Sequence, residues 1–230
     1  QFKTEGIMTD YVAKDPKHPS GVALITVDAR GENTIVVAQG SNGKLSPDDV
    51  NKGAEEFSRA GYILTQLETP LDTIMHVAKL ASDNGKKIIL NPAPAQSLPS
   101  TLFPYLYLIT PNETETEVLT GIKIRDQSSI KQAAEKLKEK GVANVIITMG
   151  SEGAYLYEDG NGVIIPTRKV KAVDTTAAGD IFNGALAVAL AEGNTLKQAV
   201  EFANHAAAIS VTKMGAQASA PYRKEIMNAL

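Results

Sequence analysis

The feature that most constrains the fold is an alternation of strand-type and helix-type segments between residues 46 and 150. We expect strands at residues 62–67, 87–90, 105–109 and 142–149, and helices at 46–60, 69–84, from 110 onward and at 126–140. Such an alternation predicts an α/β fold with a mostly parallel central sheet and helices on both of its faces.

The flanking segments extend this pattern at both ends. β-type runs at residues 21–28 and 33–39 predict a hairpin, and short strands are expected at 154–157, 163–166 and 169–173. Helices are expected at about 178–192, 195–213 and 221–229. Ligands of parallel sheets bind beyond the carboxyl ends of the strands. We therefore expect Glu68, Asn91, Asn112, Gly150 and residues 174–180 to gather at one edge.

Composition narrows the class of protein. The 230 residues are 43% hydrophobic and 21% charged, which is typical of a soluble globular protein. A net charge of −3 does not favour a nucleic-acid or membrane partner. The sequence contains no cysteine, which excludes disulfides and thiolate metal sites and fits a cytoplasmic protein. No apolar run approaches membrane-spanning length.

The segment from Val173 to Gly184 carries the strongest chemical signal. Small residues lead into an apolar, helix-type run, so several backbone N–H groups at a helix start can face one anion. Asp180 lies just inside that start, where a carboxylate could remove a proton from a hydroxyl while the N–H groups hold a phosphoryl group. Ordinary helix capping and an ordinary glycine turn would explain the same residues.

Two well-known nucleotide motifs are missing. Gly43-Lys44 is followed by Leu45, so it does not complete a Walker A loop, and no G-x-G-x-x-G run occurs. Residues 149–153 follow a strand-type run and contain two glycines around a serine, which could wrap a phosphate. A plain hairpin turn between two strands is the alternative.

The segment 110–115 has a structural explanation for half of its residues. Thr110 is expected to cap a helix, Pro111 to occupy its first position, and Glu113 to close a capping box. Asn112 and Glu115 are left over, and they could hold a phosphate and a hydrated Mg²⁺. The three histidines lack metal-ligand spacing, so a zinc site is not expected.

Taken together and in this order, the motifs resemble those of the ribokinases of the PfkB-type carbohydrate kinase family. The residues that carry the resemblance are Gln66-Leu67-Glu68, Asn91-Pro92-Ala93-Pro94-Ala95, Pro111-Asn112-Glu113-Thr114-Glu115, residues 174–184 and Gly215-Ala216-Gln217-Ala218-Ser219. The resemblance implies a three-layer sandwich with a small β lid. It also implies ATP-dependent phosphorylation of the 5-hydroxyl of ribose, with Mg²⁺ and with K⁺ as an activator.

The resemblance also assigns roles to individual positions. Asp180 corresponds to the general base, Ala177, Ala178 and Gly179 to the anion hole, and Glu68, Ala23 and Ile25 to sugar-side positions. The implied ATP-binding residues are Asn112, Thr148, Gly150, Ser151, Gly153, Gly179 and Asn204, and Glu115 holds Mg²⁺ through water. The implied K⁺ site comprises Asp174, Thr176, Ser210, Lys213, Gly215 and Ser219, mostly through backbone carbonyls.

One departure from the family pattern affects the sugar site. An initial strand with a sugar-binding Asn and Asp, and a following Gly-Gly-Lys-Gly-Ala-Asn segment, are not found in this sequence. We therefore expect a fragment with an exposed sheet edge, consisting of a partial lid at 1–42 and a catalytic domain at 43–230 that lacks its first strands. The lid hairpin could pair with that of a second copy. Another kinase of the family, acting on fructose, a nucleoside or a related sugar, and a non-catalytic nucleotide-binding fragment are the alternative functions.

Overall fold

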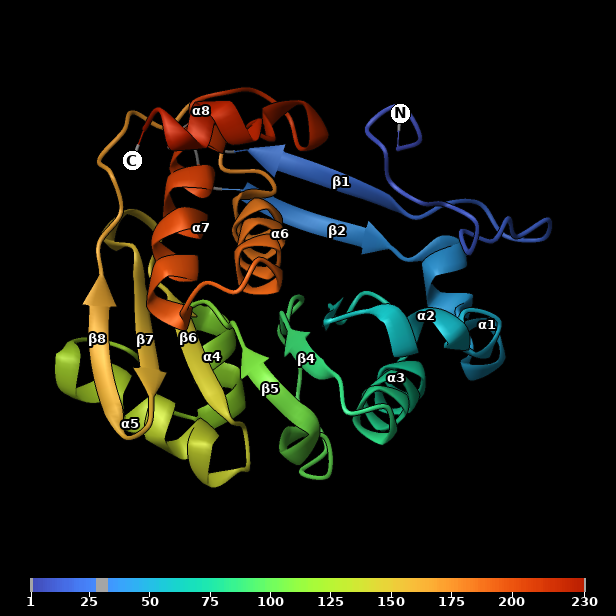
Figure 1. The fold of residues 1–230 in the computed structure, drawn as a ribbon. Helices are drawn as coiled ribbons and strands as arrows, with labels where there is room; N and C mark the ends of the chain where they lie inside the picture. Colours follow the sequence, from blue (N-terminus) through green and yellow to red (C-terminus); the bar gives the residue numbers. More distant parts are fainter. Residues whose placement is uncertain (1, 28–32, 230) are drawn as a thin grey trace.

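A six-stranded sheet forms the centre of the computed structural model, which describes residues 2–27 and 33–229 (Figure 1). Its strands lie in sequence order as β3 (Tyr62–Thr65), β4 (Lys87–Leu90), β5 (Leu106–Ile109), β6 (Asn144–Thr148), β7 (Ala154–Glu158) and β8 (Asn161–Ile165). The pairs from β3 to β6 are parallel, whereas β7 and β8 are antiparallel to their neighbours. The predicted mostly parallel sheet is confirmed.

Helices cover both faces of this sheet and complete three layers. One face carries α3 (Leu71–Asp83), α4 (Glu113–Thr120) and α5 (Gln127–Glu139), and the other carries α6 (Ala178–Ala191) and α7 (Leu196–Ser210) (Figure 1). Side chains alternate along each strand, so Ile88 and Leu90 pack in the α3–α5 layer while Ile89 packs in the α6–α7 layer. The chain therefore has the expected three-layer α/β architecture.

The helix expected at residues 46–60 is divided in two. The structure places α1 at Pro47–Asn51 and α2 at Ala54–Arg59, with a turn in which Gly53 N–H donates to Val50 O at 3.0 Å. The ring of Tyr11 lies 3.4 Å from where a Cβ of Gly53 would be. A single helix was therefore the wrong prediction, because Gly53 is a poor helix former and Tyr11 packs at the break.

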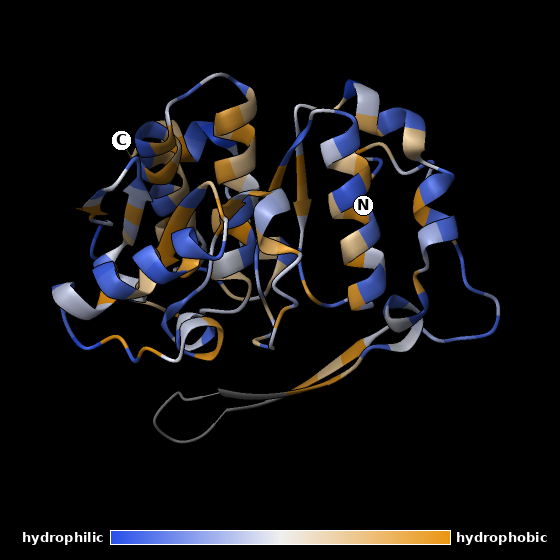
Figure 2. Ribbon diagram, turned by 90° about the horizontal axis from the view of Figure 1, so that it is seen from below, coloured by the Kyte–Doolittle hydropathy of each residue, from blue (hydrophilic) through white to orange (hydrophobic). Residues whose placement is uncertain are grey.

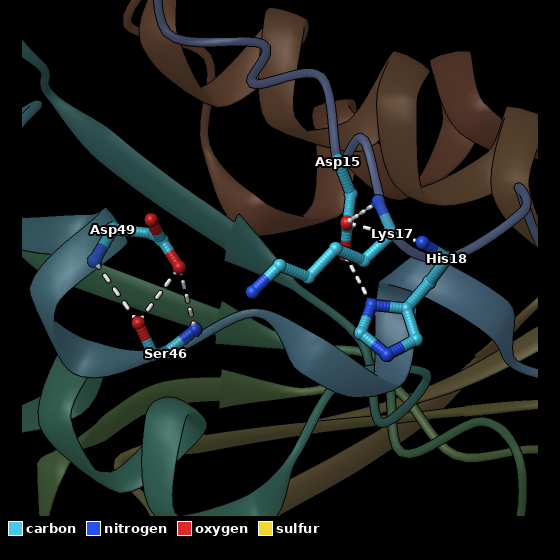
Figure 3. Close-up of polar contacts among 5 residues, drawn as sticks. All are labelled: Asp15, Lys17, His18, Ser46 and Asp49. Carbon is cyan, nitrogen blue, oxygen red and sulfur yellow. Dashed lines mark hydrogen bonds and ion pairs between the residues drawn. The ribbon is translucent and has the colours of Figure 1, made fainter.

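The start of α1 is fixed by a capping box between Ser46 and Asp49. Ser46 Oγ accepts from Asp49 N–H at 3.3 Å, and Asp49 Oδ2 accepts from Ser46 N–H at 3.2 Å (Figure 3). The ammonium of Lys52 and the hydroxyl of Ser46, both hydrogen-bonded to Asp49, lower the pKa of its carboxyl to about 2. Figure 3 also shows Asp15, which accepts from the N–H groups of Lys17 and His18 in the N-terminal segment. The helix start expected at residue 46 is confirmed, with Ser46 as its N-cap.

The predicted hairpin is present as a separate two-stranded sheet. Strands β1 (Val22–Val27) and β2 (Asn33–Ala38) are antiparallel, and Val22 pairs with Ala38. Figure 2 shows the hairpin extending beyond the helices, as expected of a lid. The connection at residues 28–32 lies outside the described residues, and the proposed division at residue 42 stays a prediction.

The C-terminal third is helical apart from its first segment. The helices α6 and α7 and the short α8 (Arg223–Met227) match the prediction, but residues 169–173 form no strand in the described structure. Val173 N–H instead donates to Val211 O at 2.7 Å, so this segment is held by the loop after α7. Across residues 2–27 and 33–229, none of the helices has the length and apolar character needed to cross a membrane.

Candidate active site

The start of α6 lies at the carboxyl edge of the parallel strands. Asp180, in the first turn, accepts from Gln66 directly after β3, and Asn183, one turn later, accepts from Thr110 directly after β5. Ala177 caps the helix in the left-handed region with φ at 62°. The predicted convergence of chain segments at one edge of the sheet is therefore present.

The backbone N–H groups at the start of α6 differ in whether they are free to bind an anion. Ala178 N–H donates to Thr175 O at 3.2 Å, whereas within the described part of the chain Gly179 N–H and Asp180 N–H have no hydrogen-bond partner. First-turn N–H groups have no intrahelical acceptor and carry partial positive charge. The arrangement offers two donors to an anion beside the Asp180 carboxylate.

A cleft of about 500 Å³ opens next to Asp180. Gln66, Glu68 and Thr69 line it from the end of β3, and Asn42 lines it from the segment that follows the lid. Both carboxylates of the cleft are exposed. A polyhydroxyl ligand would find hydrogen-bond acceptors and amide groups on several sides of this space.

Asn112 and Glu115 cap α4, which corrects the assignment made from the sequence. Asn112 Oδ1 accepts from Glu115 N–H at 2.8 Å, and Glu115 Oε2 accepts from Asn112 N–H at 2.8 Å. Thr110 and Glu113 were the wrong choice for the capping box, because the helix begins at Glu113 and Asn112 is its N-cap. Burial raises the pKa of Glu115, although its bond from the Asn112 N–H opposes that shift.

The loop after β6 lies beside this cap. Thr148 N–H donates to Pro111 O at 2.9 Å, and Thr148 forms a parallel bridge with Asn112. Residues Gly150–Glu152 form a short 3-10 turn that connects β6 to β7, so the hairpin alternative describes its structure. Asn112, Thr148 and the exposed Ser151 therefore line one continuous stretch of the sheet edge.

The segments before α6 and after α7 are joined through Asp174. Its carboxylate accepts from Thr176 N–H at 2.9 Å and from Gly215 N–H at 2.9 Å. The hydrogen bonds from Thr176 and Gly215 hold the pKa of Asp174 below its ordinary value. Two loops with several backbone carbonyls are thus fixed side by side.

A family model decides the class of protein. The model for pfkB family carbohydrate kinases matches residues 1–223. The chain belongs to this family.

Individual relatives agree with the family assignment. The chain is 43% identical over 229 residues to a ribokinase of Haemophilus influenzae, covering 100% of this chain and 75% of that protein. It is 39% identical over 217 residues to a deoxyribokinase of Salmonella typhi, covering 94% and 71%. A structure of Arabidopsis thaliana ribokinase complexed with ribose and ATP matches with a TM-score of 0.84 and 33% identity, covering 92% of this chain and 69% of that one.

Not every position expected from the kinase family points into a shared site. Ala23 of β1 is not one of the described residues that line the cleft. The side chain of Ile25 lies outside the described residues. Asn204 is buried in α7, and its Nδ2 donates to Ile165 O at 2.9 Å. Lys213 Nζ donates to Glu225 at 2.7 Å.

The acidic side chains of this kinase indicate what kind of metal site it can form. No cluster of three or more His, Cys, Asp or Glu side chains suited to a metal occurs within residues 2–27 and 33–229. Both oxygens of Glu115 accept from Asn112. A single carboxylate such as that of Glu115 fits a Mg²⁺ ion that takes most of its ligands from nucleotide phosphates and water, which is the common arrangement in kinases.

Several amide and hydroxyl side chains contact the site although no sequence motif assigns them a role. Gln66 belongs to the motif Gln66-Leu67-Glu68 and contacts Asp180 directly, and Asn183 accepts from Thr110. A detectable signal was the position of Gln66, two residues before Glu68 and therefore on the same side of an extended chain. Hydrogen bonds across the sheet edge have no comparable sequence signal.

Proposed function

We propose that the chain is an ATP-dependent ribokinase that transfers the γ-phosphoryl group of ATP to the 5-hydroxyl of D-ribose. The observation that carries this proposal is the exposed Asp180 carboxylate, which lies in the first turn of α6 and lines a cleft of about 500 Å³. The similarity to named ribokinases supports ribose as the acceptor. The products are ribose 5-phosphate and ADP.

In the proposed mechanism, Asp180 removes the proton of the sugar hydroxyl. The hydroxyl oxygen forms a bond to the γ-phosphorus while the bond from that phosphorus to the ADP oxygen breaks, and ADP leaves with the electron pair. The N–H groups at the start of α6, from Ala177 to Gly179 in the family assignment, stabilise the charge of the migrating group. Among the described residues, the N–H groups of Ala177 and Gly179 in that set have no acceptor within the protein, and the same holds for the N–H of Asp180.

The proposed nucleotide site follows the edge from Asn112 to the loop after β6. Thr148, Gly150, Ser151 and Gly153 line it, together with Gly179 and, near the adenosine, Asn204. The buried contact of Asn204 with the carbonyl at the end of β8 gives it a supporting role in shaping that wall. Glu115 would hold Mg²⁺ through water, and a bound Mg²⁺ would supply charge neutralisation at the phosphates.

We also propose a K⁺ site between the two loops that Asp174 joins. The proposed ligands are mainly backbone carbonyls around Thr176, Ser210, Lys213, Gly215 and Ser219. The hydroxyls of Ser210 and Ser219 already donate to Ala207 O and Ala216 O, and Lys213 is paired with Glu225. Those contacts favour a structural role for these side chains and leave the carbonyls as donors to a cation.

The hairpin of β1 and β2 is the proposed dimer contact. Leu24 and Val36 are paired across the hairpin and, with Val22, leave large apolar side chains exposed on one face. A second copy of the hairpin would cover them. Sedimentation of this chain at rising concentration should show a dimer that Leu24→Asp dissociates.

We place the enzyme in the cytoplasm, where ATP is available.

The experiment that tests the proposed function measures ADP formation by this chain with Mg²⁺, with and without K⁺, against a panel of sugars. D-ribose should give the highest kcat/KM. The similarity to a deoxyribokinase makes 2-deoxy-D-ribose the second acceptor to compare, followed by D-fructose and adenosine. A preference for another acceptor would replace ribose in the proposal, and ADP binding without turnover of any acceptor would favour a non-catalytic role.

A further inference from the structure

We propose that Gln66 is a positioning residue for Asp180, and that its amide is in turn oriented by a chain of hydrogen bonds that begins at Thr110. The inference rests on the proposed role of Asp180 as the base. Gln66 Nε2 donates to Asp180 Oδ1 at 2.6 Å. A carboxylate so held keeps one oxygen fixed and presents the other to the sugar hydroxyl.

The direction of this hydrogen bond follows from its neighbours. Asn91 Nδ2 donates to the backbone carbonyl of Thr110 at 3.2 Å, which turns Asn91 Oδ1 toward Gln66. Gln66 Nε2 lies 3.4 Å from that oxygen, so its second N–H donates there. A carbonyl oxygen can only accept hydrogen bonds. The Thr110 carbonyl therefore sets the orientation of the Asn91 amide, which sets that of the Gln66 amide and directs one of its N–H groups at Asp180.

The hydroxyl of Thr110 begins a second branch that reaches the anion hole. Thr110 Oγ1 donates to Asn183 Oδ1 at 2.6 Å, which turns Asn183 Nδ2 toward Gly179 O, to which it donates at 2.8 Å. One residue at the end of β5 therefore orients both the side chain of the base and the backbone of the first turn of α6.

Burial makes these contacts specific. Thr110 is 2% exposed, Asn183 3% and Asn91 7%. A polar group in such surroundings is stable only when it is hydrogen-bonded, so alternative orientations that break a bond are disfavoured. A fully satisfied polar network of this kind holds its members in one arrangement. Gln66 and Asp180 stand at its open end, in the wall of the cleft.

The kinetic test compares Gln66→Met with the wild-type chain. Methionine keeps the length of the side chain but donates no hydrogen bond, so kcat should fall about tenfold to a hundredfold, since small misplacements of catalytic groups have effects of this size. The KM for ATP should stay near the wild-type value, whereas the thermal midpoint should fall because the buried Asn91 Oδ1 loses its donor, so kcat is compared per amount of folded protein. Gln66→Glu, which sets a second carboxylate beside Asp180, should lower kcat further.

Gln132→Met is the matched control. It makes the same chemical change at an exposed position on α5, on the opposite face of the sheet, and should leave kcat unchanged. If Gln66→Met keeps the wild-type kcat, or loses kcat only in proportion to lost folded protein, the positioning role is overturned.

A second measurement separates this inference from the proposed function. In ¹⁵N-labelled protein, the side-chain amide of Gln66 should show one N–H proton shifted downfield of the exposed Gln132 amide, and Asp180→Ala should abolish the shift. A chain that phosphorylates no sugar would contradict the proposed function while this signal still decides the contact. A Gln66 amide signal that Asp180→Ala leaves unchanged would overturn the contact itself.

Discussion

Replacing Thr110 by valine should lower the free energy of unfolding by more than the loss of an exposed hydroxyl group would. Valine has the shape of threonine, so packing is kept, but the buried Asn183 Oδ1 loses the donor that lies 2.6 Å away. An unsatisfied buried acceptor costs about 1–3 kcal/mol. For a chain of 230 residues, each kcal/mol lowers the thermal midpoint by about 2–4 °C. The expected shift is therefore about 4–8 °C for a cost of about 2 kcal/mol.

The assay is thermal unfolding followed by calorimetry, with denaturant unfolding as a check on the free energy. Thr212→Val is the matched control, because the exposed Thr212 hydroxyl donates to Ile209 O and to no other group among the described residues, and its loss should change stability by less than about 0.5 kcal/mol. The double variant Thr110→Val with Asn183→Leu should cost less than the sum of the single changes. Equal stabilities of Thr110→Val and Thr212→Val would refute the network.

Three further predictions concern other parts of the sheet edge. Gly153→Ala should lower the free energy of unfolding by more than about 3 kcal/mol, because a Cβ there would overlap the Ile165 carbonyl at a φ of 94°. Gly160→Ala, which lies in open space at a φ of 79°, should lower it by about 1 kcal/mol. Denaturant unfolding would compare the two variants. Burial raises the pKa of Glu115, so its contribution to stability is complete below the unfolded-state pKa and is lost as pH rises through the folded-state pKa. The stability of wild type relative to Glu115→Gln should therefore fall as pH rises above about 4.5, and a rise would contradict the assignment. Asp174→Ala should abolish K⁺ stimulation of turnover in a KCl titration, and full stimulation in the variant would exclude the proposed cation site.

The layer structure could be predicted because it depends on periodic patterns. Apolar runs such as residues 87–90 match β4, and the helices expected from residues 46 and 126 begin at Pro47 and Gln127. Errors occurred where tertiary contacts decide the local structure. Residues 169–173 alternate like a strand, but they lie against the loop after α7 and have no strand partner among the described residues.

The candidate site could be predicted in its position but not in its internal contacts. The sheet topology places Glu68 and Asp180 at one edge, as expected from their positions after strands or at a helix start. Which residue caps α4 depends on where the helix begins, and a shift of two residues transferred that role from Thr110 to Asn112. The amide chain from Thr110 to Gln66 joins three strands, and no local pattern encodes such a chain.

The most direct test of the account is the rate of ribose-dependent ADP formation by this 230-residue chain and by its Asp180→Asn variant, with ADP binding measured in parallel by calorimetry. Asparagine keeps the shape of the side chain but cannot accept the proton of the sugar hydroxyl. We predict ribose-dependent turnover in the wild-type chain and its loss in the variant, with ADP affinity unchanged. Turnover that survives in Asp180→Asn would contradict the assignment of Asp180 as the general base.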